Sequence, residues 1–170
     1  MAAMMYLSPD YIDSLPNLQE SSGHFDTSGL PDDPNRLFAK WFTNAVDNGV
    51  LDARAVTVAT VDTEGRPDAR TVDLAFLDSN GFHFGTAADT AKVRQMEKNT
   101  GAALNFWWQP VRRAVRVRGN TRRKVDGDRF NLWCIEPDQF EFFQLAADRL
   151  NSERVAYFRD EAGEWQHREI

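Results

Sequence analysis

The sequence has little cysteine and no long apolar run. Cys134 is the only cysteine in 170 residues, which excludes internal disulfides and any zinc site built from cysteines. No apolar stretch approaches the roughly 20 residues that a membrane-spanning helix needs. The first ten residues contain neither Lys nor Arg and no long apolar stretch, unlike a secretory signal. We therefore expect a soluble, cytoplasmic protein without a membrane partner.

The usual catalytic and metal-binding patterns are also scarce. The three histidines, His24, His83 and His167, do not have the spacing of metal ligands, so no metal site is expected. Neither a Gly-x-Ser-x-Gly motif nor a phosphate-binding Gly-rich loop occurs. Cys134 lies between a tryptophan and an isoleucine, which favours a small buried side chain over a nucleophile. The sequence therefore assigns no catalytic residue.

Apolar and aromatic residues, by contrast, are plentiful. The hydrophobic fraction is 42%, with 12 Phe and 5 Trp, which excludes a disordered or fibrous chain. Lys and Arg number 20 against 26 Asp and Glu, so the formal charge is −6. An acidic surface disfavours general binding to nucleic acid or membranes. The length suits one ordinary domain with a real core.

The chain divides into an arm and one domain. Residues 1–29 are rich in Ser, Asp, Gly and Pro without a sustained period, which predicts a flexible arm, disordered alone or ordered against a partner subunit. Residues 30–170 are predicted to form a single domain. Asp33 and Pro34 have the residue types that begin a helix. Its apolar stripe is predicted to be Leu37, Phe38, Trp41, Phe42 and Ala45, with Gly49 at its end.

After residue 54 the apolar period changes to two. The alternation predicts strands at 55–61, 70–77 and 82–86, joined by tight turns. Three strands in a meander indicate an antiparallel sheet or barrel. We also expect strands at 102–108, 114–118, 141–144, 155–159 and 165–168, and helices at 90–99 and 126–135. The predicted fold class is mainly β with flanking helices.

Positive charge is concentrated between Arg112 and Lys124. Seven of these thirteen residues are basic. On a strand, Arg116 and Arg118 would share one face while valines occupy the other. The cluster is either a solvated barrel face or a site for a phosphate-bearing ligand or a nucleic-acid backbone. The acidic balance of the whole chain favours a small anion over nucleic acid.

Several motifs follow one another in an order that resembles a known family. They are Leu30-Pro-Asp-Asp-Pro, Val58-Ala-Thr-Val-Asp, Arg70-Thr-Val-Asp-Leu, Phe84-Gly-Thr, Lys92, Ala103-Leu-Asn-Phe-Trp-Trp, Glu141-Phe-Phe-Gln and Arg149-Leu-Asn. Together they resemble pyridoxamine 5′-phosphate oxidase and its FMN-binding split-barrel relatives. The resemblance covers roughly residues 28–168, and it describes a diverged and shortened member.

The resemblance implies an antiparallel split β-barrel that forms a homodimer, with FMN in clefts between the subunits. The family's cofactor contacts carry over to Arg70, Thr71, Val72, Asp73, Leu74, Thr86, Thr90, Lys92, Phe143 and Arg154. Among these, Arg70 and Lys92 would hold the phosphate, because arginine and lysine form charge-assisted hydrogen bonds to a dianion. The substrate contacts carry over to Arg149 and to Asn151, which stands where the family has a histidine.

The departures from the family pattern bear on the substrate. Ala75 stands where the family has a lysine that reaches the substrate, and Ala114 stands for a glutamine at the flavin. A long helical stretch of the family is missing between Val125 and Trp133. In the family this stretch holds the residues that grip the substrate phosphate. Pyridoxamine phosphate is therefore not the expected substrate.

These residues support two functional hypotheses. The first is an FMN-dependent oxidoreductase that oxidises a small heteroaromatic or secondary-metabolite substrate. Hydride would pass to flavin N5 and dioxygen would reoxidise the flavin, so no strong side-chain acid or base is required. The alternative is a non-catalytic dimer of the same fold that binds a flavin or another small molecule, which the alanines at ligand positions favour.

Overall fold

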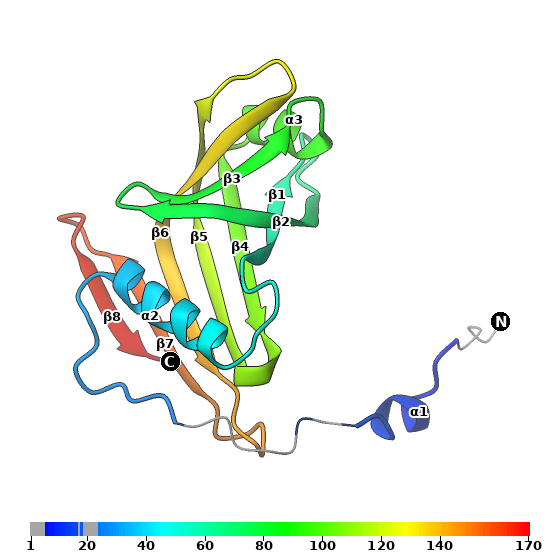
Figure 1. Cartoon of the computed structure of the whole chain (residues 1–170), viewed down its shortest axis with the longest axis vertical. Coiled ribbons are helices and arrows are strands. Elements are labelled where there is room, and N and C mark those ends of the chain that lie inside the picture. Colours follow the sequence, from blue (N-terminus) through cyan, green and yellow to red (C-terminus); the bar gives the residue numbers. More distant parts are fainter. Residues whose placement is uncertain (1–5, 17, 19–23) are drawn as a thin grey trace.

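A computed structural model describes residues 6–16, 18 and 24–170, so residues 1–5, 17 and 19–23 of the predicted arm lie outside the described residues. Figure 1 shows a sheet that curls into a barrel, with helices packed on it. The elements are α1 (Pro9–Asp13), α2 (Pro34–Asp47), β1 (Ala55–Val61), β2 (Pro67–Asp78), β3 (Gly81–Ala87), α3 (Ala91–Lys98), β4 (Gly101–Trp108), a 3₁₀ turn (Gln109–Val111), β5 (Arg113–Val125), β6 (Phe130–Gln144), β7 (Glu153–Arg159) and β8 (Trp165–Glu169).

The sheet closes on itself through β6. The strand order is β3-β2-β1-β4-β5-β6-β7-β8, and β3 pairs in addition with β6. All these pairs are antiparallel, and β3 meets β6 from Phe82 opposite Ile135 to Ala87 opposite Phe130. Six strands therefore form a closed barrel, while β7 and β8 extend the sheet beyond it. The predicted fold class, mainly β with a split antiparallel barrel, is confirmed.

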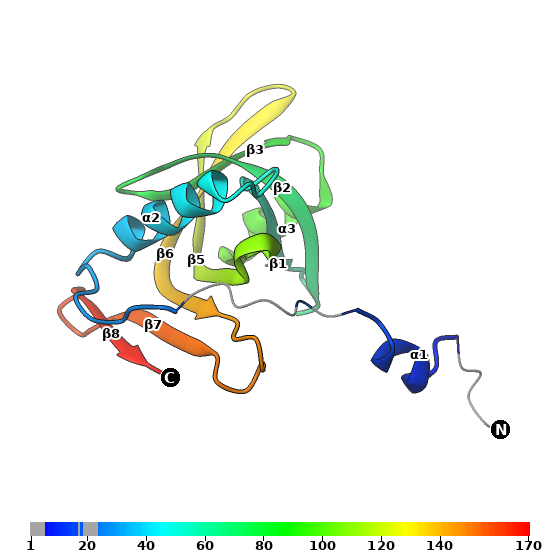
Figure 2. The same ribbon diagram turned by 60° about the horizontal axis from the view of Figure 1, so that its bottom comes forward.

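Figure 2 shows α2 lying across the barrel, and most of its apolar stripe is buried: Leu37, Phe38, Trp41 and Ala45. The Asp33 side chain caps it by accepting a hydrogen bond from the Asn35 backbone N–H at 2.9 Å. Phe38 contacts Phe82 and Phe106 edge to face, at centroid distances of 4.8 and 4.9 Å. Such aromatic pairs add to the stabilisation from burial alone. The predicted helices near Asp33 and Thr90 are confirmed, and none of the helices in the described residues is long and apolar enough to cross a membrane.

Packing on the barrel begins before residue 30. The Phe25 ring is buried against Trp41, with the centroids 4.7 Å apart. The backbone N–H of Phe25 also donates to Glu153 Oε2 at 2.6 Å. By contrast, α1 has no buried residue. Within the predicted arm, the segment next to the domain therefore packs against β7 and α2 of its own chain.

The helix predicted at residues 126–135 is wrong. Residues from Phe130 onward belong to β6, which is a single strand of fifteen residues and includes the predicted short strand at 141–144. Asn131, Trp133 and Ile135 are buried at every second position, as on one face of a strand, and Cys134 between the last two is buried as well. The prediction used only the local sequence, whereas this segment becomes a strand because it pairs with both β3 and β5. The fifth strand is likewise longer than predicted, since β5 runs from Arg113 to Val125.

Candidate functional site

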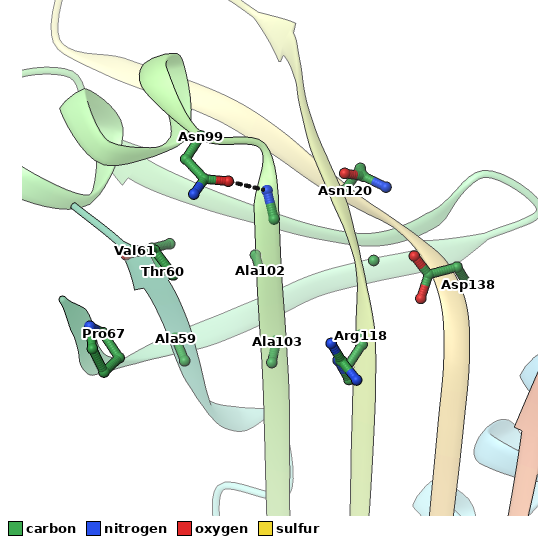
Figure 3. Close-up of a pocket in the computed structure, with 12 residues that line it drawn as sticks. Ala59, Thr60, Val61, Pro67, Asn99, Ala102, Ala103, Arg118, Asn120 and Asp138 are labelled. Atoms are coloured by element: carbon green, nitrogen blue, oxygen red, sulfur yellow. Dashed lines mark hydrogen bonds between the residues drawn. The ribbon is translucent and has the colours of Figure 1, made fainter. Parts of the chain in front are cut away.

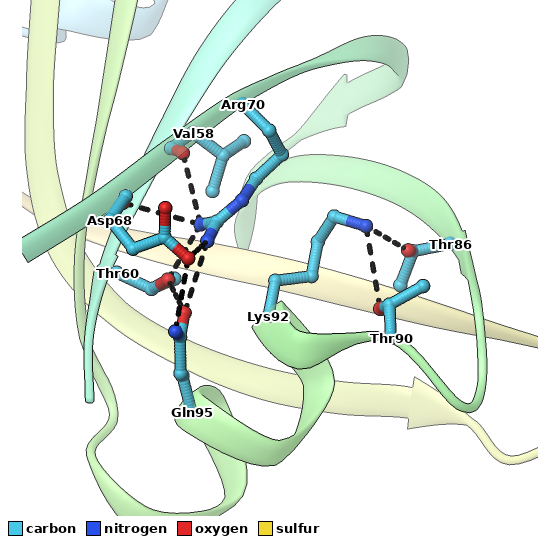
Figure 4. A network of polar contacts seen from close by, with 8 residues as sticks. All are labelled: Val58, Thr60, Asp68, Arg70, Thr86, Thr90, Lys92 and Gln95. Atoms are coloured by element: carbon cyan, nitrogen blue, oxygen red, sulfur yellow. Dashed lines mark hydrogen bonds and ion pairs between the residues drawn. The ribbon is translucent and has the colours of Figure 1, made fainter. Parts of the chain in front are cut away.

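Arg70 is the centre of a polar network at one end of the barrel (Figure 4). Its Nη1 donates to Thr60 Oγ1 at 2.6 Å. Its Nη2 forms an ion pair with Asp68 Oδ2 at 2.6 Å and donates to Gln95 Oε1 at 3.1 Å. A hydrogen bond from Gln95 and the charge of Arg70 lower the pKa of the Asp68 carboxyl. The guanidinium is therefore held in one position by groups from β1, β2 and α3.

Lys92 is the second residue of α3 and lies in the same region. Its Nζ donates to Thr86 Oγ1 at 2.8 Å and to Thr90 Oγ1 at 3.4 Å. In the described residues this ammonium has no carboxylate within ion-pair distance. Partial burial, and then the charge of Arg70, lower the pKa of the Lys92 side chain. Two cations thus lie near this end of the barrel, the Arg70 guanidinium on Asp68 and the Lys92 ammonium on the hydroxyl groups of Thr86 and Thr90 (Figure 4).

This group of side chains fits the phosphate of FMN. A phosphate dianion accepts several hydrogen bonds and requires positive charge nearby, which a lysine, an arginine and two hydroxyls supply. An anion bound beside the Lys92 ammonium would give it an opposite charge in addition to its hydroxyl partners. Arg70, Thr86, Thr90 and Lys92 would hold such a group. We call these four residues the phosphate cluster.

The predicted ring-binding residues Thr71, Val72, Asp73 and Leu74 follow Arg70 on β2. Val72 and Leu74 pack against the core, while Thr71 and Asp73 are exposed. β2 pairs with β1 up to Asp73, whereas its pairing with β3 begins only at Leu74. Among the described residues, the second edge of β2 from Thr71 to Asp73 therefore lacks a strand partner. Its backbone groups are available to a ligand lying along that edge.

The other predicted residues form a second group, far along the sheet from the first. Phe143 on β6 lies opposite Arg154 on β7, and the Arg154 guanidinium sits over the Phe143 ring at 4.7 Å. Arg149 and Asn151 belong to the connection between these strands, where Asn151 Nδ2 donates to Asp148 Oδ2. Figure 1 shows this connection at the opposite end of the molecule from α3. Within one chain, the predicted site is therefore divided into two groups.

A row of side chains links Phe143 to its neighbouring strands. Trp107 on β4 is opposite Ala114 on β5, which is opposite Phe143. The Trp107 side chain is 44% exposed, although tryptophan is large and mostly apolar. The small Ala114 lies between these two aromatic residues, and the Arg154 guanidinium covers one face of the Phe143 ring. The outer face of the sheet therefore presents aromatic surface beside Arg154.

Most of the basic cluster on β5 is neutralised by neighbouring acidic residues. Arg116 pairs with Glu141 at 2.6 Å, and Arg122 pairs with Glu136 at 2.7 Å. Lys124 also reaches Glu136, at 3.2 Å. Arg123 pairs with Glu97 and Asp126, whereas Arg118 and Arg113 have neutral partners and the buried Arg112 has, among the described residues, no hydrogen-bond partner for either Nη atom. For Arg116, Arg122, Arg123 and Lys124, these contacts favour the solvated barrel face over an anion-binding site.

A cavity of about 400 Å³ lies on the outer side of β1, β4 and β5 (Figure 3). Small residues such as Ala59 and Ala103 form its floor, and Arg118 and Asp138 stand at its edge. Gly119 also lines it, and a Cβ at this position would lie 2.1 Å from the Glu136 carbonyl oxygen. None of the four residues of the phosphate cluster lines this cavity, although Thr60, which accepts a hydrogen bond from Arg70, does.

Sequence reasoning did not identify Thr60, Asp68 and Gln95 as partners of Arg70. One signal was present, because Asp68 and Arg70 are two residues apart on one strand and share a face. Gln95 lies on α3, 25 residues after Arg70, so the local sequence does not indicate its hydrogen bond with Arg70. Hydrogen bonds and an ion pair to these three residues fix the orientation of the Arg70 guanidinium.

Comparison with known proteins gives the family and the fold of the chain. Residues 42–168 match the family model described as pyridoxamine 5′-phosphate oxidase. A pyridoxine/pyridoxamine 5′-phosphate oxidase of Azorhizobium caulinodans is 44% identical over 117 residues, which are 69% of this chain and 54% of the relative. With 54% and 51% of the first two relatives matched, the chain spans about half the length of the curated relatives.

Two solved structures share the fold. PhzG from Burkholderia lata 383, in complex with tetrahydrophenazine-1-carboxylic acid, superposes with a TM-score of 0.79 and 19% identity, covering 86% of this chain and 96% of that one. A pyridoxamine 5′-phosphate oxidase-related, FMN-binding protein of Nostoc punctiforme gives a TM-score of 0.71 at 18% identity, covering 84% and 98%. The family match extends over most of the barrel that carries both groups of site residues. The chain belongs to the pyridoxamine 5′-phosphate oxidase family.

Proposed function

We propose that this protein is an FMN-dependent oxidoreductase, acting as an oxidase on a small heteroaromatic substrate. The observation that carries the proposal is the phosphate cluster, in which the Lys92 ammonium has, among the described residues, only the hydroxyl groups of Thr86 and Thr90 as partners. The family match and the FMN-binding neighbour support the choice of FMN.

In this proposal the residues of the chain bind FMN and orient its ring. Arg70 and Lys92 neutralise the phosphate, while Thr86 and Thr90 donate from their hydroxyls. The open edge of β2 offers backbone hydrogen-bonding groups to the ring, as far as Asp73. FMN, when bound, supplies the hydride acceptor, with dioxygen as the final oxidant. No side-chain acid or base is needed for that chemistry.

We further propose that the active form is a homodimer. The two groups of predicted residues lie at different ends of the sheet, so Phe143 and Arg154 of one copy would meet the phosphate cluster of the other. The exposed Trp107 and its neighbours supply apolar surface for such an interface. Sedimentation at micromolar concentration should give a dimer. A protein that remains monomeric at that concentration would contradict the proposal.

The substrate is proposed to differ from pyridoxamine phosphate. This chain has Ala75 at the position of a substrate-reaching lysine, and the β5–β6 connection is a short hairpin between Val125 and Phe130. A site without polar partners for a phosphate loses most of its discrimination for that group. The heterocyclic acid bound to the PhzG relative is a nearer guide to the substrate class. Incubation with pyridoxamine phosphate and FMN should produce little pyridoxal phosphate, and rapid turnover would overturn this part.

The cofactor claim is tested by absorbance. Protein purified with FMN should keep a flavin band near ~450 nm after gel filtration, because the chemistry and the spectrum are those of the cofactor. Anaerobic reduction followed by admission of air should restore the band if the protein is an oxidase. Flavin that remains bound and shows no faster reoxidation than free FMN would favour the alternative of a non-catalytic binding protein. A protein that stays colourless and does not bind added FMN would contradict the proposal.

A further inference from the structure

A second cavity lies between α2 and the C-terminal half of β2. Its volume is about 380 Å³, within the range of roughly 300–1,000 Å³ that small-molecule sites occupy. Apolar side chains form most of its wall: Phe38, Phe42, Leu74, Ala75, Phe76 and Leu77. The polar groups are few, namely Thr43 on α2 and Arg54 just before β1. An apolar wall with a few polar groups is the usual composition of a ligand site.

A β-bulge shapes this cavity. Leu74 is paired with Phe84 and Phe76 with His83, so Ala75 is the extra residue in the β2 strand. Bulges bend a strand and redirect side chains, and they are frequent beside active sites. The small Ala75 side chain leaves open the space that a longer residue would occupy. The bulge therefore shapes the cavity wall next to Leu74, the last residue predicted to lie beside the flavin ring.

The exposed Phe76 ring is held rigidly. It stacks on the His83 ring with the centroids 4.1 Å apart and the planes at 15°. His83 is itself buried and bonded through Nε2 to Asp78 Oδ1 at 3.0 Å. That hydrogen bond is the main cause that lowers the pKa of Asp78 to about 2. Phe76 thus presents a fixed aromatic face, although 45% of the residue is exposed.

Arg54 supplies a cation at the edge of the same cavity. Its Nη2 meets Asp73 Oδ2 at 3.5 Å, and both side chains are more than half exposed. An exposed ion pair of this length is weak. The guanidinium has five N–H donors, so most of them remain available to an acceptor. A carboxylate is the partner that matches this planar donor group best.

We propose that this cavity binds an aromatic carboxylate, with its ring against Phe42, Leu74 and Phe76 and its carboxylate on Arg54. The inference that this acid is a substrate rests on the proposed function, because Leu74 lines the cavity and is also predicted to lie beside the flavin ring. It specifies the substrate class of the oxidoreductase as a planar ring acid without a phosphate. The binding of such an acid is a property of the cavity itself and can be measured without turnover.

The test uses 2-naphthoate as the probe, measured by isothermal titration calorimetry on the full chain with and without FMN. Ala75→Leu fills the cavity and should weaken binding more than tenfold. Ala69→Leu, on the exposed part of the same strand and outside the cavity, is the matched control and should bind the probe like the wild type. Circular dichroism and thermal melting establish that both variants are folded.

A second pair of variants tests the charge. Arg54→Gln should weaken 2-naphthoate roughly tenfold, the loss expected for one charge-assisted contact, and leave the neutral 2-naphthalenemethanol unchanged. Arg66→Gln, in the β1–β2 turn, is the matched control. Equal binding of 2-naphthoate to the wild type and Ala75→Leu would overturn the proposal, as would equal weakening of both probes by Arg54→Gln. If the protein binds no FMN but still binds 2-naphthoate in this pattern, the proposed function fails and the cavity assignment stands.

Discussion

The protein has two basic regions, and they differ in what surrounds the charges. The β5 region is dense in the sequence, yet Arg116, Arg122 and Lys124 all pair with glutamates of β6. The phosphate cluster has only two cations, and one of them, Lys92, has hydroxyl partners alone among the described residues. The number of basic residues in a segment therefore does not locate an anion site. In the phosphate cluster, Lys92 has no carboxylate partner among the described residues, whereas Arg70 pairs with Asp68.

The largest expected effect is in the phosphate cluster. Arg70→Ala should weaken FMN binding about tenfold to a hundredfold, because hydrogen bonds to charged groups contribute about 1.5–3 kcal/mol each. Lys92→Ala should cost somewhat less, since a point charge lacks the bidentate geometry of arginine. Fluorescence titration of flavin-free protein with FMN measures both. Unchanged affinity in both folded variants would mean that the phosphate lies elsewhere.

Raising the pH should weaken FMN binding at a lower pH than a lysine with an ordinary pKa would cause. Burial and Arg70 lower the pKa of Lys92 from its ordinary value, so the free protein loses this positive charge at a lower pH. The Kd of FMN should therefore rise between neutral pH and pH ~10, below the usual lysine range. Lys92→Arg keeps its charge and should show a smaller rise. Identical pH profiles for the two proteins would contradict the assignment of Lys92 to the phosphate.

Asp68 is a carboxylate that pairs with Arg70 of the phosphate cluster. Its removal should increase the difference in anion affinity between the phosphate cluster and the β5 region. Asp68 accepts the Arg70 ion pair at 2.6 Å and competes with a phosphate for the same guanidinium. Asp68→Asn should therefore tighten FMN severalfold. Asp62→Asn, in the β1–β2 turn, is a suitable control. Weaker FMN binding to Asp68→Asn would show that the carboxylate serves to position Arg70.

The smallest effect is expected on β5. Arg122→Gln removes one partner of an ion pair whose arginine is 66% exposed. Exposed pairs of this kind contribute about 0–1 kcal/mol to stability. FMN affinity should be unchanged and the thermal midpoint nearly so. A loss of affinity comparable to that of Arg70→Ala would place the phosphate on β5 and reverse the comparison.

The sequence predicts the regular elements well where periodicity is local. The stripe of α2 and the alternation of β1 are visible in single segments, and both are confirmed. The error at residues 126–135 has a non-local cause, because pairing with β3, more than forty residues earlier, makes β6 a strand there. Turns close hairpins locally, but barrel closure depends on contacts that no short window contains.

In the candidate site, too, the residues named by the motifs were predicted, whereas contacts between distant segments were not. The resemblance named Arg70 and Lys92, and the structure brings them to one end of the barrel with Thr86 and Thr90. It did not predict that Asp68 holds Arg70, because that contact depends on side-chain direction. The cavity between α2 and β2 was equally hidden, since it arises where a bulge at Ala75 faces a helix distant in sequence.

The central claim is that FMN binds through its phosphate at Arg70 and Lys92. The most direct measurement is a parallel titration of the flavin-free wild-type protein with FMN and with riboflavin, which differs by lacking the phosphate. The account predicts that FMN binds at least tenfold more tightly, and that Arg70→Ala removes most of this difference. Equal affinity for the two flavins, or a preference for FMN that survives in Arg70→Ala and Lys92→Ala alike, would contradict it.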